Sequence, residues 1–235
     1  FYMATSYAML HKDIKNLKPE FYVIPHPYDF YPINYDVYNP PKAKWDFNYR
    51  RKIYERIIRN SQETRFFINL SNYYGFYKRP KLLNFFYTFK KYKMSNEVFE
   101  YALDDNFNSS GNSLECMIGI SKYLGFKKII LIGCDYLGKP KLDGHFYSFK
   151  DPYIGKSIDD SYIKRIQKLT TDMEVITIFP EGITSNEFKS FTYEEFFEKK
   201  NSKNKEVHIK KNHEIISDSD LNFLKKADDH LQLWI

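Results

Sequence analysis

Two segments of the sequence carry residues that could do chemistry, and each directly follows a short apolar run. The first, GCDYLGKPKLDGHFYSFKDPYIGKS from residue 133, holds Asp135, His145 and three tyrosines; the second is PEGITSNEF from residue 180. His145 is a candidate general base, because the pKa of histidine lies near the pH at which enzymes operate. The alternative is a histidine that only packs within its loop.

Several familiar catalytic motifs are missing from the sequence. It contains no GxxxxGK[ST], GxGxxG, GxSxG or HExxH pattern. Asp218 and Asp220 match the carboxylate pair with which many nucleotide-sugar enzymes hold a metal, but they lie in a polar tail, where capping a helix is the simpler role. Cys116 and Cys134 lack metal-ligand spacing. The sequence therefore predicts no metal site.

The pattern of apolar residues predicts alternating helices and strands around these segments. Strands are expected over residues 21–25, 65–70, 127–133 and 174–179, and helices over 46–60, 110–125 and 158–170, with 72–101 helical in two pieces around Pro80. This order is typical of an α/β, Rossmann-like, doubly wound and mainly parallel sheet.

The predicted fold also indicates where a ligand would bind. In such sheets ligands bind outside the carboxyl ends of the strands, which is where both chemical segments begin. The run 127–133 is nearly all apolar, which predicts a strand buried on both faces. The segment after it runs for ~25 residues without a clear regular pattern, and we expect a lid or binding loop at about 136–160.

Length and composition favour one large folded domain. The chain has 235 residues, of which 43% are hydrophobic and 19% aromatic, so a sizeable core can form and disorder is excluded. We expect an α/β domain over 1–199, followed by a linker and a C-terminal amphipathic helix over 200–235. No apolar run is long enough to span a membrane. The chain starts with Phe1 inside patterned sequence, so we expect residues upstream of it.

The basic charge is concentrated in one stretch. Residues 42–93 hold 14 Lys or Arg against three acids, a net charge of +11, while the whole chain carries +6 and the remainder therefore −5. Interleaved Tyr and Phe favour a surface that faces an anionic glycolipid or membrane, although a merely solvated surface has the same composition. No RNA- or DNA-binding motif is present, and we expect no nucleic-acid partner.

The motifs together resemble a known enzyme family. NFNSSGNSLECMIGISKYLGFKKIILIGCDYLG, DGHFYSF, YIGKS and ITIFPEGIT, from about residue 106 to 184, are similar in order and spacing to the bacterial sialyltransferases that cap lipooligosaccharide, glycosyltransferase family 42. The resemblance implies a glycosyltransferase-A-variant fold whose first strand lies upstream of Phe1. Some of the same strings also resemble surface-carbohydrate proteins related to a pterin pyrophosphokinase family.

Ten residues are candidates for the site, nine of them from the resemblance and His145 from its own chemistry. Those for substrate binding are Ser109, Ser110, Gly111, Asp135, Tyr153 and Ser157, and those for catalysis are Tyr136, His145, Tyr147 and Lys156. The resemblance implies that Tyr147 steadies the leaving phosphate in place of a metal, and that Tyr136 substitutes for a second tyrosine of the family, whose position is held here by Leu137. Lys156 stands where the family has its general-base histidine, so either His145 is the base, or Lys156 acts electrostatically on phosphate, or the chain is inactive.

Three functions follow as hypotheses. The first is a metal-independent glycosyltransferase, without a cofactor, that moves a sialic-acid-like sugar from a CMP-sugar to a bacterial surface glycan or glycolipid. The second is another nucleotide-dependent transferase on the same scaffold, and the third a glycan- or nucleotide-binding module without turnover. We expect a cytoplasmic protein. Peripheral contact with an anionic inner membrane and the formation of a homo-oligomer are both left open.

Overall fold

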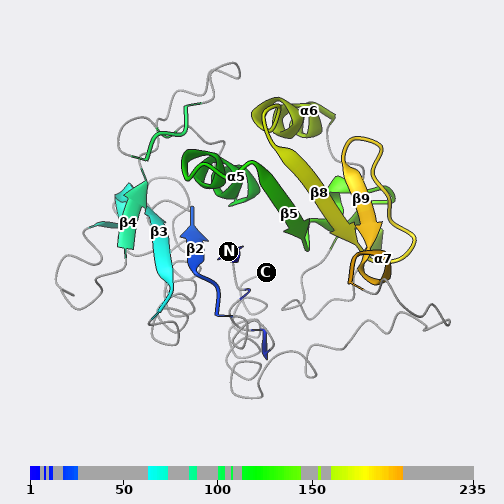
Figure 1. Ribbon diagram of the computed structural model, residues 1–235, viewed down its shortest axis with the longest axis horizontal. Coiled ribbons are helices and arrows are strands. Elements are labelled where there is room, and N and C mark those ends of the chain that lie inside the picture. Colours follow the sequence, from blue (N-terminus) through cyan, green and yellow to red (C-terminus); the bar gives the residue numbers. More distant parts are fainter. Residues whose placement is uncertain are drawn as a thin grey trace, which may run out of the picture. The chain divides into compact units, whose positions relative to one another are not determined.

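A computed structural model describes residues 1–5, 8, 11–12, 18–25, 63–73, 85–88, 100–103, 107, 113–143, 153–154 and 160–197 (Figure 1). The chain divides into two units, one made of Phe1–Met117 with His213–Ile235 and the other of Ile118–Asn212. The predicted helix at 46–60 and the predicted linker and C-terminal helix over 200–235 lie outside the described residues, as does most of the basic stretch 42–93.

The first unit contains a sheet of four parallel strands in the order β1-β2-β3-β4. Aromatic and β-branched residues favour strands, and here they form the interior: every residue of β2 is buried, as is all of β3 except its first residue. The strands are β1 (Met3–Thr5), β2 (Phe21–Ile24), β3 (Arg65–Asn69) and β4 (Phe85–Thr88), and the 3-10 helix η2 (Leu70–Asn72) follows β3.

The structure confirms two predicted strands in this unit and corrects one predicted helix. The strands expected at 21–25 and 65–70 are β2 and β3. The segment 72–101 was expected to be helical, but it contains β4, whose residues Phe85–Thr88 pair with β3. The run FFYT has high strand propensity, and the ladder with β3 satisfies its backbone groups, which no local pattern could show.

The second unit contains a parallel sheet in the order β5-β8-β9 (Figure 1). The helix α6 buries an apolar stripe that includes Ile163 and Ile166, whereas α5 is buried on more than one side, at Ile118 and at Ile120. The elements are α5 (Ser113–Tyr123), which begins in the first unit, β5 (Lys128–Ile132), η3 (Asp135–Leu137), β6 (Leu142–Asp143), β7 (Tyr153–Ile154), α6 (Asp160–Leu169), β8 (Glu174–Phe179), β9 (Lys189–Thr192) and α7 (Tyr193–Phe197).

These elements establish an α/β fold with parallel sheets. The predicted helices at 110–125 and 158–170 are α5 and α6, and the predicted strands at 127–133 and 174–179 are β5 and β8. The strand β9 was not predicted. None of the helices in the described part of the chain is long and apolar enough to cross a membrane.

The prediction that the run 127–133 is buried on both faces is wrong for two residues of β5, Ile130 and Ile132. Leu131 is buried, but Ile130 is 43% exposed and Ile132 is 53% exposed. Among the described strands β5 pairs only with β8, so it is the edge strand of its sheet. Because side chains alternate along a strand, Ile130 and Ile132 share one face and Leu131 lies on the other, so the described residues cover only one face of β5. An apolar run indicates that a strand can be covered on both faces, but it does not show that it is.

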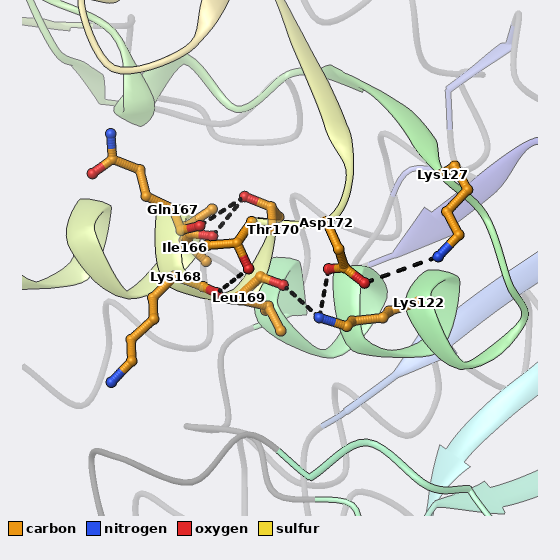
Figure 2. Close-up of polar contacts among 9 residues, drawn as sticks. Lys122, Lys127, Ile166, Gln167, Lys168, Leu169, Thr170 and Asp172 are labelled. Carbon is orange, nitrogen blue, oxygen red and sulfur yellow. Dashed lines mark hydrogen bonds and ion pairs between the residues drawn. The ribbon is translucent and has the colours of Figure 1, made fainter.

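A polar junction joins the helices α5 and α6 at the amino edge of the sheet (Figure 2). The Lys122 ammonium, near the end of α5, donates to the Leu169 carbonyl at 3.2 Å and to the Asp172 carboxylate at 2.7 Å. Lys127 lies 4.0 Å from the same carboxylate. Lys122 thus satisfies a carbonyl at the carboxyl end of α6 that the helix itself leaves unbonded.

We expect Lys122→Met to lower the free energy of unfolding by about 1 kcal/mol, because it removes one helix-end hydrogen bond and one partly exposed ion pair. Urea unfolding at neutral pH measures this change, and the difference should shrink in high salt as the ion pair is screened. Lys164→Met is the matched control, since Lys164 is exposed on α6. Equal losses in the two variants would contradict the role of the junction.

Candidate active site

The register of the second sheet brings three chain segments to one edge. Ile132, Ile178 and Phe191 are level with one another across β5, β8 and β9, so the residues that follow each strand leave from the same carboxyl edge. The helix α6 returns the chain to the start of β8, and its first turn therefore lies at this edge as well. The edge has the position at which parallel α/β sheets bind ligands.

The loop after β5 is held in place by its own packing. Gly133 has a φ of 72°, a left-handed conformation that glycine adopts without strain, and the chain then enters η3. Leu137 at the end of η3 is buried. A side chain at Gly138 would overlap Ile183, so the two loops approach as closely as a glycine allows.

The two predicted ligand-binding loops are joined directly by backbone hydrogen bonds. The amide of Lys139 donates to the carbonyl of Thr184 at 2.8 Å, and the amide of Thr184 donates to the carbonyl of Lys139 at 3.2 Å. The Lys139 ammonium also lies 3.1 Å from the Glu187 carboxylate and holds the pKa of Glu187 below its ordinary value. The loops after β5 and β8 therefore form one framework.

The most unusual group in this framework is the Asp135 carboxylate. Its Oδ1 atom is buried, and no residue in the described part of the chain donates a hydrogen bond to it. Burial raises the pKa of the Asp135 carboxyl to about 6. An ionised carboxylate can accept about four hydrogen bonds, and leaving one buried oxygen unbonded is costly. Such a group is a typical feature of sites that bind a ligand or transfer a proton.

Three tyrosines accompany Asp135 at this edge. Tyr136 follows it in η3, and its ring centroid lies 6.5 Å from that of Tyr162 in the first turn of α6. Burial raises the pKa of the Tyr136 hydroxyl, and Cys134 and Tyr162 raise it further, so the phenol stays protonated. A protonated phenol is a hydrogen-bond donor for an anion.

Cys134 does not supply a nucleophile at this site. Burial raises the pKa of its thiol to about 12, and the interaction with the Tyr136 hydroxyl only partly offsets that effect. Since the thiolate is the reactive form, this cysteine is an unreactive side chain at neutral pH. Its role is to pack beside Tyr136.

Tyr193 follows β9, the far strand of the sheet, at a well-defined helix start. Thr192 and Glu195 form a reciprocal capping box, in which the Thr192 amide donates to Glu195 at 2.8 Å and the Glu195 amide donates to the Thr192 hydroxyl at 3.1 Å. Phe191 and Phe196 pack across the cap with ring centroids 5.9 Å apart, which is the arrangement of a hydrophobic staple. Tyr193 is therefore fixed at the first position of α7.

Tyr193 is a partly exposed tyrosine, with 41% of the residue accessible to solvent. Burial of its hydroxyl raises the pKa of Tyr193, and Asp135 and Cys134 raise it further, so the phenol stays protonated.

The predicted site residues fall into two groups. The structure brings Asp135 and Tyr136 together at the carboxyl edge, and it describes the backbone of Tyr153, which pairs with Asp143 between β7 and β6. The residues that lie outside the described part of the chain are Ser109, Ser110, Gly111, His145, Tyr147, Lys156 and Ser157.

The predicted loop at about 136–160 is more regular than the sequence indicated. It was expected to lack regular structure, but its first residues belong to η3 and it contains the antiparallel pair of β6 and β7. These strands have two residues each, too short for a periodic pattern to be visible in the sequence.

Sequence reasoning missed Tyr162 and Tyr193. For Tyr193 a signal was present, because FTYEEF contains both the capping-box pattern and the two staple residues directly after a potential strand. For Tyr162 no local signal existed, since a tyrosine in a first helical turn is unremarkable until the helix is placed against a strand end.

The start of α5, just after the predicted substrate turn 109–111, contains a buried polar contact in the first unit. The Tyr101 hydroxyl donates to the Glu115 carboxylate at 2.9 Å, and both residues are buried. The Tyr101 ring also meets the Phe107 ring edge-on, with centroids 5.2 Å apart. Tyr101 thus contacts residues on both sides of 109–111 in the chain.

Comparison with protein-family models, curated proteins and solved structures finds no match to this chain. Membership in the sialyltransferase family stays a prediction. Among the described residues no group of three or more His, Cys, Asp or Glu side chains is placed to hold a metal ion.

Proposed function

We propose that this chain is a glycosyltransferase that moves a sialic-acid-like sugar from a CMP-sugar to a hydroxyl group of a bacterial surface glycan, without a metal ion. The observation that carries the proposal is the Asp135 carboxylate at the carboxyl edge of three parallel strands, whose buried Oδ1 accepts no hydrogen bond from the described residues. A position that served only stability would not favour a buried carboxylate oxygen without a hydrogen-bond donor among its described neighbours.

The reaction needs a proton acceptor and a donor of hydrogen bonds to phosphate. The acceptor hydroxyl oxygen forms a bond to the anomeric carbon of the donor sugar, while the bond from that carbon to the phosphate oxygen breaks and CMP leaves with the electron pair. The hydroxyl proton passes to a base. Asp135, with a pKa of about 6, is ionised at neutral pH and can orient this hydroxyl or receive its proton.

The protonated phenol of Tyr136 suits the other half of the reaction. It can donate to the oxygen of the leaving phosphate without competing ionisation, since its pKa is raised. Phosphate would lie away from Asp135, because two anionic groups in contact repel each other. Tyr147 as a second donor, His145 or Lys156 as the base, and Ser109, Ser110, Gly111, Tyr153 and Ser157 as substrate contacts remain part of the proposal.

A titration with nucleotides tests the proposed function. The whole chain is titrated calorimetrically with CMP, with ATP, and with each of them in the presence of Mg²⁺, and CMP-sugar turnover is followed with a galactoside acceptor. We expect CMP to bind without metal and turnover to be insensitive to EDTA. Binding of ATP only with Mg²⁺ would instead favour a pyrophosphoryl transferase, and binding of CMP without any turnover would favour a non-catalytic module.

A further inference from the structure

Tyr162 is a residue of the candidate site that the sequence did not single out, and a ring contact joins it to Tyr136. The two ring centroids lie 6.5 Å apart and the rings are tilted by 45°, an arrangement in which aromatic side chains attract each other beyond the burial of their area. Tyr136 belongs to η3 after β5, whereas Tyr162 lies in the first turn of α6. The contact therefore joins two elements that are separate in the sequence.

The hydroxyl group of Tyr162 is not available to a ligand. Its oxygen is buried, although the residue as a whole is only partly buried. A catalytic residue has to touch the substrate or the reacting atoms, which a covered hydroxyl does not do. Any part that Tyr162 takes in the reaction therefore acts through a neighbouring side chain, and Tyr136 is in ring contact with it.

The helix α6 gives the Tyr162 ring a rigid base. Ile166 and Leu169 follow Tyr162 by four and seven residues, which places the three side chains on one side of the helix. Both Ile166 and Leu169 are almost completely buried, so Tyr162 extends the buried stripe of α6 toward the carboxyl edge of the sheet. Side chains on a packed helix are held more precisely than side chains on loops.

On the other side of the contact, the backbone of Tyr136 is fixed but its side chain needs a further support. The Leu137 amide donates to the Cys134 carbonyl at 2.8 Å, and the Leu137 side chain is buried. The Gly138 amide donates to the Asp135 carbonyl at 3.1 Å. These bonds hold the main chain of η3, while the torsion angles of the Tyr136 side chain still decide where its hydroxyl points. A ring packed against Tyr136 limits these angles.

We propose that Tyr162 is a positioning residue, whose ring holds the Tyr136 side chain so that the Tyr136 hydroxyl points to the leaving phosphate of the donor. The inference rests on the proposed function, in which Tyr136 donates to that phosphate. A donor of this kind has to lie within hydrogen-bond distance of the developing anion, and a misplacement of about 1 Å can lower a rate by about 100-fold. Tyr162 thus affects kcat without touching the substrate.

A double-mutant cycle between Tyr162 and Tyr136 tests this proposal in the whole chain. Tyr162→Leu removes the ring, and we expect it to lower kcat of CMP-sugar transfer by about tenfold, while the donor KM stays within about threefold. Tyr162→Phe keeps the ring and should stay within about threefold of the parent in kcat. In the Tyr136→Phe background, where the hydroxyl is already absent, Tyr162→Leu should lower kcat no further.

The cycle separates positioning from a loss of stability. A residue that only stabilised the fold would lower activity by the same factor in both backgrounds, and this result would overturn the proposal. Thr170→Val is the matched control, because it removes a buried hydrogen bond of 2.8 Å to the Ile166 carbonyl at the far end of α6. It should destabilise the protein but leave kcat unchanged. If Tyr162→Leu does not fold, Tyr162→Met serves in the same cycle, because methionine fills space with a flexible side chain.

A measurement on Tyr136 itself distinguishes the inference from the function on which it rests. In protein with tyrosine isotope-labelled at Cζ, the NMR signal of Tyr136 is assigned by its loss in Tyr136→Phe and followed during a titration with CMP. We expect CMP to shift this signal in the parent and in Tyr162→Phe, and to shift it much less in Tyr162→Leu. A parent signal that CMP does not shift would overturn the proposal.

The two measurements together separate four results. The expected NMR shifts without any CMP-sugar turnover would keep the positioning role and overturn the transferase assignment. Turnover with equal losses from Tyr162→Leu in both backgrounds would keep the transferase assignment and overturn the positioning role. Turnover with a loss only in the parent background supports both, and the absence of both turnover and a CMP-induced shift overturns both.

Discussion

Replacing Asp135 by Asn is expected to stabilise the protein by up to about 3 kcal/mol at pH 7.5 while strongly reducing transfer. Burial raises the pKa of this carboxyl from 3.8 to about 6, and each pKa unit corresponds to about 1.4 kcal/mol. The ionised group is therefore a cost to the folded state that a neutral isostere of the same shape removes.

The raised pKa of Asp135 also predicts the direction in which the stability of the parent changes with pH. Between about pH 4 and pH 6 the folded state binds more protons at Asp135 than the unfolded state does, so the parent loses stability as the pH rises through this window. The Asp135→Asn variant does not lose stability in this way, because it has no carboxyl group to ionise at this position. The stability difference should therefore be fully present above about pH 6 and close toward pH 4, as measured by urea unfolding across this range.

Asp172→Asn is the control with the opposite sign. The Lys122 ammonium lowers the pKa of Asp172, so its charge supports the folded state at neutral pH and the support is lost as the pH falls through the folded-state pKa. The variant should be slightly less stable than the parent at pH 7.5, with a small change because the pair is partly exposed. A destabilised Asp135→Asn would show that Asp135 has a partner and would remove the observation on which the proposed function depends.

The second large effect concerns the Tyr136 hydroxyl. If this phenol donates to the leaving phosphate, Tyr136→Phe keeps the ring beside Tyr162 and should lower kcat by ~10²-fold, the range found when one donor to a developing anion is lost. The KM for the donor should change much less, because the hydrogen bond strengthens as the phosphate leaves.

Stability must be measured alongside turnover, since Tyr136 also interacts with Cys134. Loss of one hydrogen bond accounts for about 1 kcal/mol of folding free energy, which leaves the protein folded at the assay temperature. Tyr123→Phe, at an exposed tyrosine, should leave kcat unchanged. A Tyr136→Phe variant with full kcat would assign the leaving-group role to other residues, of which Tyr147 is the one predicted.

Local patterns in the sequence predicted most of the regular elements of this chain and the sheet edge at which the candidate site lies. The helices α5 and α6 and the strands β2, β3, β5 and β8 were predicted because the spacing of apolar residues is a property of the chain segment itself. The rule that ligands bind beyond the carboxyl ends of parallel strands selected the two loops, and the resemblance to the sialyltransferase family selected Asp135 and Tyr136 within the first of them.

Only the tertiary structure decided strand pairing, burial and the membership of the site. The strand β4 owes its form to its ladder with β3, and the exposure of Ile130 and Ile132 shows that one face of β5 is left uncovered by the described residues. The strand β9, and with it Tyr193, takes its place in the sheet because β9 pairs with β8. The raised pKa of Asp135 likewise depends on desolvation by packed neighbours, which no periodicity encodes, because burial is a property of the whole fold and not of a segment.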